Sequence, residues 1–154
     1  MGLLRGAGIG DTPRRVQPGD FIANRFEIER LAGAGGMGAV YVGRPRAGGP
    51  QRPLVAVKRA HAHLLEDPTF RKMFVAEARL AARIHHANVV GVTDIDESDG
   101  ELLIVMDYVE GAALSDLLAK ALEADRQVPA RIALRIALDA CAGLHAAHEL
   151  CDEN

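Results

Sequence analysis

A glycine-rich run, Gly33-Ala34-Gly35-Gly36-Met37-Gly38, lies between two segments that have the residue pattern of β-strands. Residues 26–32 alternate apolar and polar side chains, and residues 39–42 are mostly apolar. In dinucleotide-binding folds the same G-x-G-x-x-G spacing leads from a strand into a helix. Here no helical pattern begins before residue 60, so we expect a β-hairpin tip whose backbone amides can approach phosphate oxygens. Taken alone, the motif is also compatible with a glycine-rich turn that binds nothing, although the phosphate-binding interpretation is favoured.

A second strand pattern, Val55-Ala56-Val57-Lys58, follows the hairpin. The intervening residues 43–53 are rich in Gly, Pro and Arg, so we predict a long irregular connection there. Because side chains alternate along a strand, Ala56 and Lys58 face the same way. A small side chain beside a flat ligand, with a cation two residues on, suits a purine and its phosphates. A surface lysine at a strand end is the alternative.

The next element is predicted to be a helix that starts at Asp67 and Pro68 and runs to about His85. Asp can cap a helix, and the fixed φ of Pro suits the first helical position. The apolar side chains of this segment fall on one arc: Phe70, Met73, Phe74, Leu80, Ala81 and Ile84. Glu77 lies in the middle of that arc, and a buried carboxylate is costly unless a cation meets it. The sequence therefore predicts a buried, positively charged partner for Glu77.

The remaining pattern predicts two strands and then two helices. Residues 89–96 and 101–108 read as strands joined by a turn, and helices are expected over 114–122 and from Pro129 to about His148. The last of these is apolar around most of its circumference, which is typical of a helix inside a domain. Residues 1–20 show no periodicity, and we predict a flexible leader there.

Composition excludes several classes of function. The 18 basic and 21 acidic residues give a net charge of −3, which argues against a nucleic-acid-binding or membrane-surface protein. No apolar run approaches the roughly 20 residues of a membrane helix, and no signal-peptide pattern is present, so we expect a cytoplasmic location and no membrane contact within this segment. The two cysteines fit neither a disulfide framework nor a metal site, and we predict no bound metal within the chain.

The motifs, in this order, resemble the N-terminal half of a bacterial serine/threonine protein kinase over residues 24–150. The matching strings are Gly33-x-Gly35-x-x-Gly38-x-Val40, Val55-Ala56-Val57-Lys58, the helical Glu77, His86-Ala87-Asn88-Val89-Val90, and Leu103 to Val109 with Gly111. The resemblance implies an α+β fold with a kinase-like N-lobe over residues 21–110, made of a five-stranded antiparallel sheet plus helix C. Residues 111–154 would then be the exit from the hinge and the first helices of a helical C-lobe.

The resemblance also implies ATP as the ligand. The loop formed by Gly33, Ala34, Gly35, Gly36, Met37 and Gly38 would cover its phosphates. Lys58 would pair with the α- and β-phosphates and with Glu77, and these two are the expected catalytic residues. The adenine pocket would be lined by Ala32, Val40 and Ala56. Met106 would be the gatekeeper, and the backbone from Asp107 to Val109 the hinge that binds adenine.

Two departures from the family pattern are mild, and one is not. Ala87 stands where the family usually has Pro, and the connection before the lysine strand is long. More seriously, the 154 residues contain no H-R-D string and no D-F-G string. In the family, these two motifs carry the catalytic Asp and the Mg ligands. We therefore expect an N-terminal fragment, truncated before the catalytic loop and inactive alone, of an enzyme that phosphorylates Ser or Thr of a protein substrate. The Mg ligands would lie beyond the end of the chain. The alternative is a non-catalytic, pseudokinase-like module that binds a nucleotide or a partner.

Overall fold

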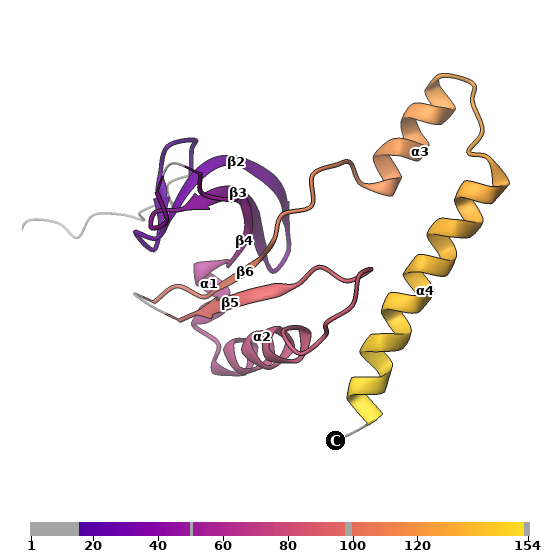
Figure 1. Ribbon diagram of the computed structural model, residues 1–154. Helices are drawn as coiled ribbons and strands as arrows, with labels where there is room; N and C mark the ends of the chain where they lie inside the picture. Colours follow the sequence, from indigo (N-terminus) through magenta and orange to yellow (C-terminus); the bar gives the residue numbers. More distant parts are fainter. Residues whose placement is uncertain (1–15, 50, 98–99, 153–154) are drawn as a thin grey trace, which may run out of the picture.

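A curled antiparallel sheet takes its strands from residues 21–107 (Figure 1). The computed structural model describes residues 16–49, 51–97 and 100–152, so most of the predicted leader lies outside the described residues. The elements in chain order are β1 (Phe21–Ile22), β2 (Phe26–Gly35), β3 (Gly38–Pro45), β4 (Val55–Ala60), α1 (Ala62–Leu65), α2 (Pro68–Ala81), β5 (Val92–Asp96), β6 (Leu103–Asp107), α3 (Leu114–Glu123) and α4 (Ala130–Asp152).

The sheet has six strands in the order β1-β2-β3-β4-β6-β5, and every neighbouring pair is antiparallel. The predicted α+β N-lobe architecture is confirmed. The predicted number of five strands is wrong by one, because β1 is only two residues long and leaves no readable alternation. The predicted irregular connection also begins too early, because β3 continues through Pro45.

The two faces of the sheet build two separate cores. Val57, Leu103 and Val105 point into the curl and pack with Ile22, Phe26 and Ile28 from the opposite edge. The alternate residues, Leu102 and Ile104 together with Ala60, pack against α2. This period-two division is the pattern expected of a strand with both faces buried.

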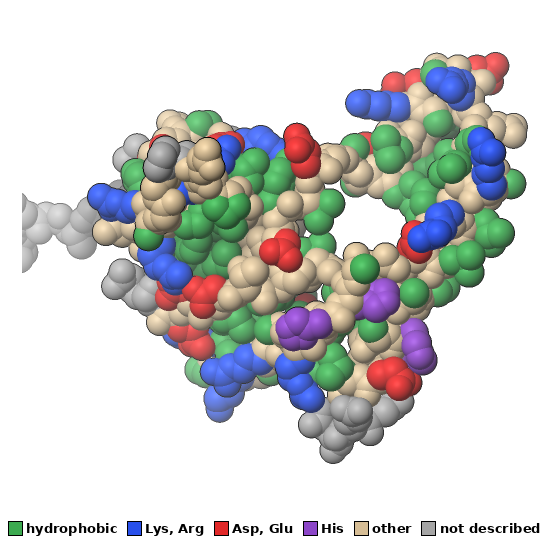
Figure 2. Space-filling model, viewed as in Figure 1, with side chains coloured by type: hydrophobic (Ala, Val, Ile, Leu, Met, Phe, Trp, Pro, Cys, Tyr) green, Lys and Arg blue, Asp and Glu red, His purple; other side chains and the backbone are tan. Residues whose placement is uncertain are grey.

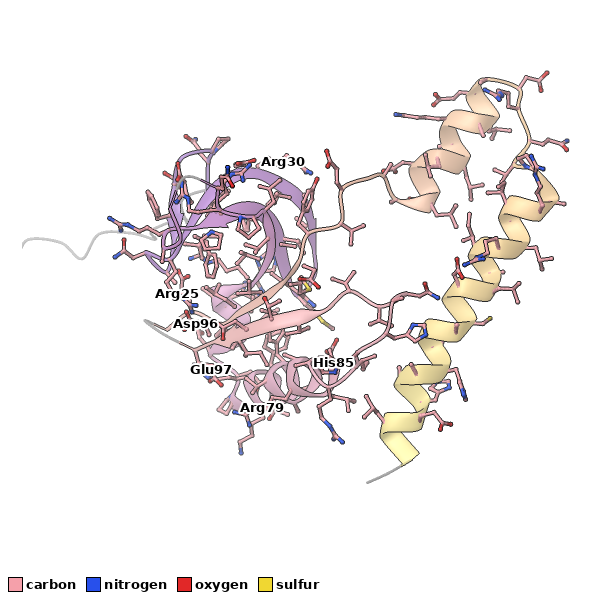
Figure 3. All side chains as sticks on the ribbon, in the orientation of Figure 1. Arg25, Arg30, Arg79, His85, Asp96 and Glu97 are labelled. Atoms are coloured by element: carbon pink, nitrogen blue, oxygen red, sulfur yellow. The ribbon has the colours of Figure 1, made fainter. Side chains whose placement is uncertain are left out.

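Arg25 joins the two edges of the curled sheet. It lies in the turn between β1 and β2, and its guanidinium donates hydrogen bonds to Asp94, at 2.7 Å, and to Asp96 on β5. Figure 3 shows Arg25 and Asp96 lying together at this closure. The hydrogen bond that Arg25 donates to Asp94, followed by the one that it donates to Asp96, raises the pKa of Arg25 above its ordinary value.

Helix α2 starts where the sequence predicts. The carboxylate of Asp67 accepts a hydrogen bond from the backbone N–H of Thr69 at 2.8 Å, and Pro68 occupies the first turn. The helix ends at Ala81, one turn earlier than predicted. Turns follow it as far as Ile84, where the N–H groups of Arg83 and Ile84 donate to the carbonyl oxygens of Leu80 and Ala81.

The buried face of α2 differs from the prediction. Phe74, Val75 and Ala78 are buried, whereas Met73 and Leu80 are 48% and 36% exposed. Consecutive helical residues differ by about 100° around the axis, so the buried face is centred near Ala78 and not near Glu77.

Helices α3 and α4 form an arm beside the N-lobe (Figure 1). Gly143 of α4 is buried and lies against the segment after α2. A Cβ at this position would lie 2.9 Å from the carbonyl oxygen of Asn88 and 3.2 Å from Val89 Cγ2. Most leucines of the arm face solvent, with Leu122 81% exposed and Leu134 62% exposed, although the apolar circumference of α4 is typical of a helix inside a domain. Figure 2 shows these apolar side chains along the arm. In the described part of the chain, no helix is both long enough and apolar enough to span a membrane.

Candidate nucleotide site

The glycine-rich run forms the tip of the β2–β3 hairpin, as predicted. Gly35 pairs with Gly38, and Gly36 and Met37 form the two-residue turn between them. The pairing register shifts between Leu31 and Gly33, so Ala32 lies at an irregularity in β2, where it is exposed. The motif therefore connects two strands, which excludes the strand-to-helix geometry of a dinucleotide-binding fold.

The glycines of this loop have two different roles. A Cβ on Gly38 would overlap the carbonyl group of Arg59 and lie 3.1 Å from Ala60 Cα, so the β3–β4 pairing itself requires a glycine there. Gly33, Gly35 and Gly36 have nothing within 4 Å of a Cβ and no left-handed φ. The fold therefore does not explain these three glycines, whereas a ligand that closely approaches the backbone would.

A hollow of about 310 Å³ lies between the loop and Lys58. Its walls consist of Gly33, Ala34, Gly35, Gly36, Met37, Gly38, Val40 and Lys58. All eight belong to the set that the sequence predicts to bind the nucleotide. A further hollow of about 360 Å³ lies at the β1–β2 turn, but its two arginines are already engaged: Arg25 with Asp94 and Arg46 with Asn24.

Lys58 and its neighbours share one face of the sheet. Lys58 pairs directly with Val40, and Ala56 pairs with Met106; directly paired residues of adjacent strands point to the same side. Val57, between Ala56 and Lys58, is fully buried on the opposite face. The predicted orientation of the lysine strand is confirmed.

The predicted Lys58–Glu77 ion pair is not formed in this structure, where both residues are described. The Lys58 ammonium lies 5.1 Å from the centroid of the Phe74 ring, in cation–π geometry, and Glu77 is exposed on α2. The prediction of a buried Glu77 is therefore wrong, and the rotation of the buried face toward Ala78 is the reason. Phe74 and Glu77 are neighbours at i and i+3 on the helix surface, so the ring occupies the place that the sequence gives to the carboxylate.

The predicted hinge leaves the sheet at the end of β6. The N–H of Asp107 donates to the carbonyl of Gly91 at 2.9 Å, so an adenine contact would have to use other backbone groups of this segment. Val109 is 68% exposed. Met106 is half-buried and packs against the α2 core, while Asp107 and Val109 do not line the hollow beneath the loop.

Two contacts around the site were not predicted. Arg30 of β2 donates a hydrogen bond to the hydroxyl of Tyr108 at 2.8 Å and lies over its ring, which connects the strand before the loop to the hinge. Figure 3 shows Arg30 on β2. His61, directly after β4, contacts the tip of the glycine-rich loop. In each contact the two residues are far apart in sequence, and neither contact belongs to a recognisable motif.

Comparison with known proteins decides the family. Residues 26–149 match the family model described as "Protein tyrosine and serine/threonine kinase". The chain belongs to this protein kinase family. Its sheet and α2 are thus a kinase N-lobe, with β2–β3 as the glycine-rich hairpin and α2 as helix C, and α3 and α4 are C-lobe helices.

Curated relatives are bacterial kinases. The chain is 36% identical over 132 residues to the serine/threonine-protein kinase PknB of Mycobacterium leprae, and 34% identical over 128 residues to the tyrosine-protein kinase MasK of Myxococcus xanthus. Each alignment covers 83% of this chain and 20% of the relative. The kinase domain of PknI from Mycobacterium tuberculosis has a TM-score of 0.68 and 28% identity, over 87% of this chain and 52% of that one. The chain thus spans about half of a solved kinase domain.

Proposed function

We propose that this chain is the ATP-binding half of a bacterial serine/threonine protein kinase. The observation that carries the proposal is the hollow between the glycine-rich loop and Lys58. Three of its glycines leave open the space that side chains would fill, and the ammonium of Lys58 lies on the opposite wall. A phosphate chain fits this arrangement, because backbone N–H groups and a lysine are what the family uses to hold it.

Adenine would lie further along the same face of the sheet, against Val40, Ala56 and Met106. These residues are neighbours across β3, β4 and β6, and the backbone from Asp107 to Val109 follows directly. Arg30 and Tyr108 hold the two ends of this region together. The proposal includes a cytoplasmic location, where ATP is available, and a Ser or Thr hydroxyl of a protein as acceptor for the whole kinase.

Glu77 has a role in this proposal only after α2 rotates. A rotation of the helix about its axis would exchange the Phe74 ring for the Glu77 carboxylate beside Lys58, because residues at i and i+3 differ by about 60° around the helix axis. In the present arrangement Lys58 is free of a carboxylate partner among the described residues, and its charge is available to a phosphate.

The chain alone is proposed to bind nucleotide without transferring phosphate. No group of three His, Cys, Asp or Glu side chains able to hold a metal occurs among the described residues, and the H-R-D and D-F-G strings are absent from the sequence. We therefore derive no step through Mg. Incubation with radiolabelled ATP and a generic acceptor protein tests this point. Turnover above background that disappears in Lys58→Ala would contradict it.

Nucleotide affinity tests the binding proposal. Replacing Lys58 with Met removes a charge-assisted contact to phosphate worth about 1.5–3 kcal/mol, which corresponds to at least a tenfold loss of ATP affinity by calorimetry. The matched control is Lys72→Met, which makes the same change of charge on the exposed surface of α2. Equal ATP affinities for Lys58→Met and Lys72→Met would refute the proposed site.

A further inference from the structure

His61 holds both sides of the turn at the tip of the glycine-rich loop. It lies between β4 and α1, and its Nε2 is 2.9 Å from the carbonyl oxygen of Gly35. Its backbone N–H donates to the carbonyl oxygen of Met37 at 3.2 Å. One residue outside the loop thus contacts the residues on either side of Gly36.

The chemistry of the side-chain contact fixes its direction. A carbonyl oxygen only accepts hydrogen bonds, so Nε2 of His61 must carry the proton. The ring of His63 stacks on that of His61 at 5.5 Å between centroids and 18° between planes. His61 is itself half-buried. These contacts limit the rotation of the imidazole and keep its donor aimed at Gly35.

Apart from its backbone pairing, the loop has few side-chain contacts near its tip. Gly33, Gly35 and Gly36 carry no side chains, nothing lies within 4 Å of their Cβ positions, and Met37 is 48% exposed. A glycine-rich turn of this kind loses much backbone freedom when it closes over a ligand. An anchor that already restricts the turn in the free protein reduces that loss on binding.

We propose that His61 is a positioning residue for the phosphate-binding loop. It restricts the loop tip above Lys58 before ATP arrives, and therefore strengthens the binding of the phosphates and not of the nucleoside. This inference rests on the proposed function, because it assigns a new residue to the same site. His61 would act by restricting the loop, without contacting the nucleotide itself.

The experiment compares ATP with adenosine in four forms of the chain. His61→Ala is expected to weaken ATP binding about fivefold, the scale of one hydrogen bond, and to leave adenosine binding unchanged. His61→Gln retains an N–H donor on a side chain of similar reach and is expected to restore most of the ATP affinity. The wild type and His85→Ala, an exposed histidine on the segment after α2, are the controls.

Each outcome bears on the proposal. An unchanged ATP affinity in His61→Ala would overturn it, and so would an equal loss for ATP and adenosine, because that would indicate general damage to the fold. A wild type that binds no ATP would refute the proposed function, and the nucleotide role of His61 with it. Amide hydrogen exchange at Gly36 and Met37 gives a readout that needs no nucleotide: it should be faster in His61→Ala and not in His85→Ala, and equal rates would overturn the anchor.

Discussion

An alanine scan of the glycines separates those that the fold requires from those reserved for a ligand. In Gly38→Ala the new methyl group overlaps the backbone of Arg59 and Ala60. Overpacking of this kind costs about 1–3 kcal/mol, and a paired backbone cannot rotate away, so we expect about 3 kcal/mol. For a chain of this size that lowers the Tm by roughly 6–12 °C. Gly35→Ala meets open space and should change the free energy of unfolding by less than about 0.5 kcal/mol.

The assay is thermal and urea unfolding of both variants beside the wild type, followed by ATP titration of those that fold. Gly35→Ala should keep its stability and lose ATP affinity, because the added methyl group projects into the space proposed for phosphate. A destabilisation of Gly35→Ala equal to that of Gly38→Ala would refute the division of the glycines. Full ATP affinity in a stable Gly35→Ala would refute the assignment of that space to the ligand.

Three further predictions concern the elements around the site. Arg25→Met removes the clamp to Asp94 and Asp96, and should cost about 1 kcal/mol in urea unfolding, because the side chains of Arg25 and Asp94 are nearly half exposed although that of Asp96 is mostly buried. Because the pKa of Arg25 in the folded chain lies above its ordinary value, the contribution of the clamp is fully present below that ordinary value, so it should survive from neutral pH to pH 10, and a loss over that range would contradict the assignment. Glu77→Gln should leave the ATP affinity of this chain unchanged, since no carboxylate of the described residues contacts Lys58, and a tenfold loss would show that the pair forms in solution. Gly143→Leu should separate α4 from Asn88 and speed amide exchange over residues 130–148, whereas unchanged exchange would mean that this contact does not hold the helix.

The sequence predicts the strands and helices well because each has a local signal. The hairpin depends on glycines between two alternating segments, and α2 starts at an Asp cap followed by Pro, which the structure confirms. The orientation of Ala56 and Lys58 follows from the two-residue period of a strand, and the pairing with Val40 and Met106 bears it out. The two-residue β1 has no such signal and was not predicted.

The arrangement of side chains between elements could not be read in the same way. The helical arc of α2 places Glu77 among apolar residues, but the sheet packs against the neighbouring face, which carries Phe74, Val75 and Ala78. A hydrophobic arc therefore predicts a helix and only approximately its buried side. The contacts of Arg30 with Tyr108 and of His61 with Gly35 depend on the curl of the sheet, which no local pattern specifies.

The most direct test of the account is an NMR titration of the ¹⁵N-labelled chain with ATP. We predict amide shift changes at two places that are far apart in sequence: residues 33–38 of the glycine-rich loop and residues 106–109 of the hinge, with Lys58 between them. Adenosine should move the hinge signals and leave those of the loop nearly unchanged, because it lacks phosphates. Shift changes confined to α3 and α4, or none at millimolar ATP, would contradict the claim that this half of a kinase domain binds the nucleotide beneath its glycine-rich loop.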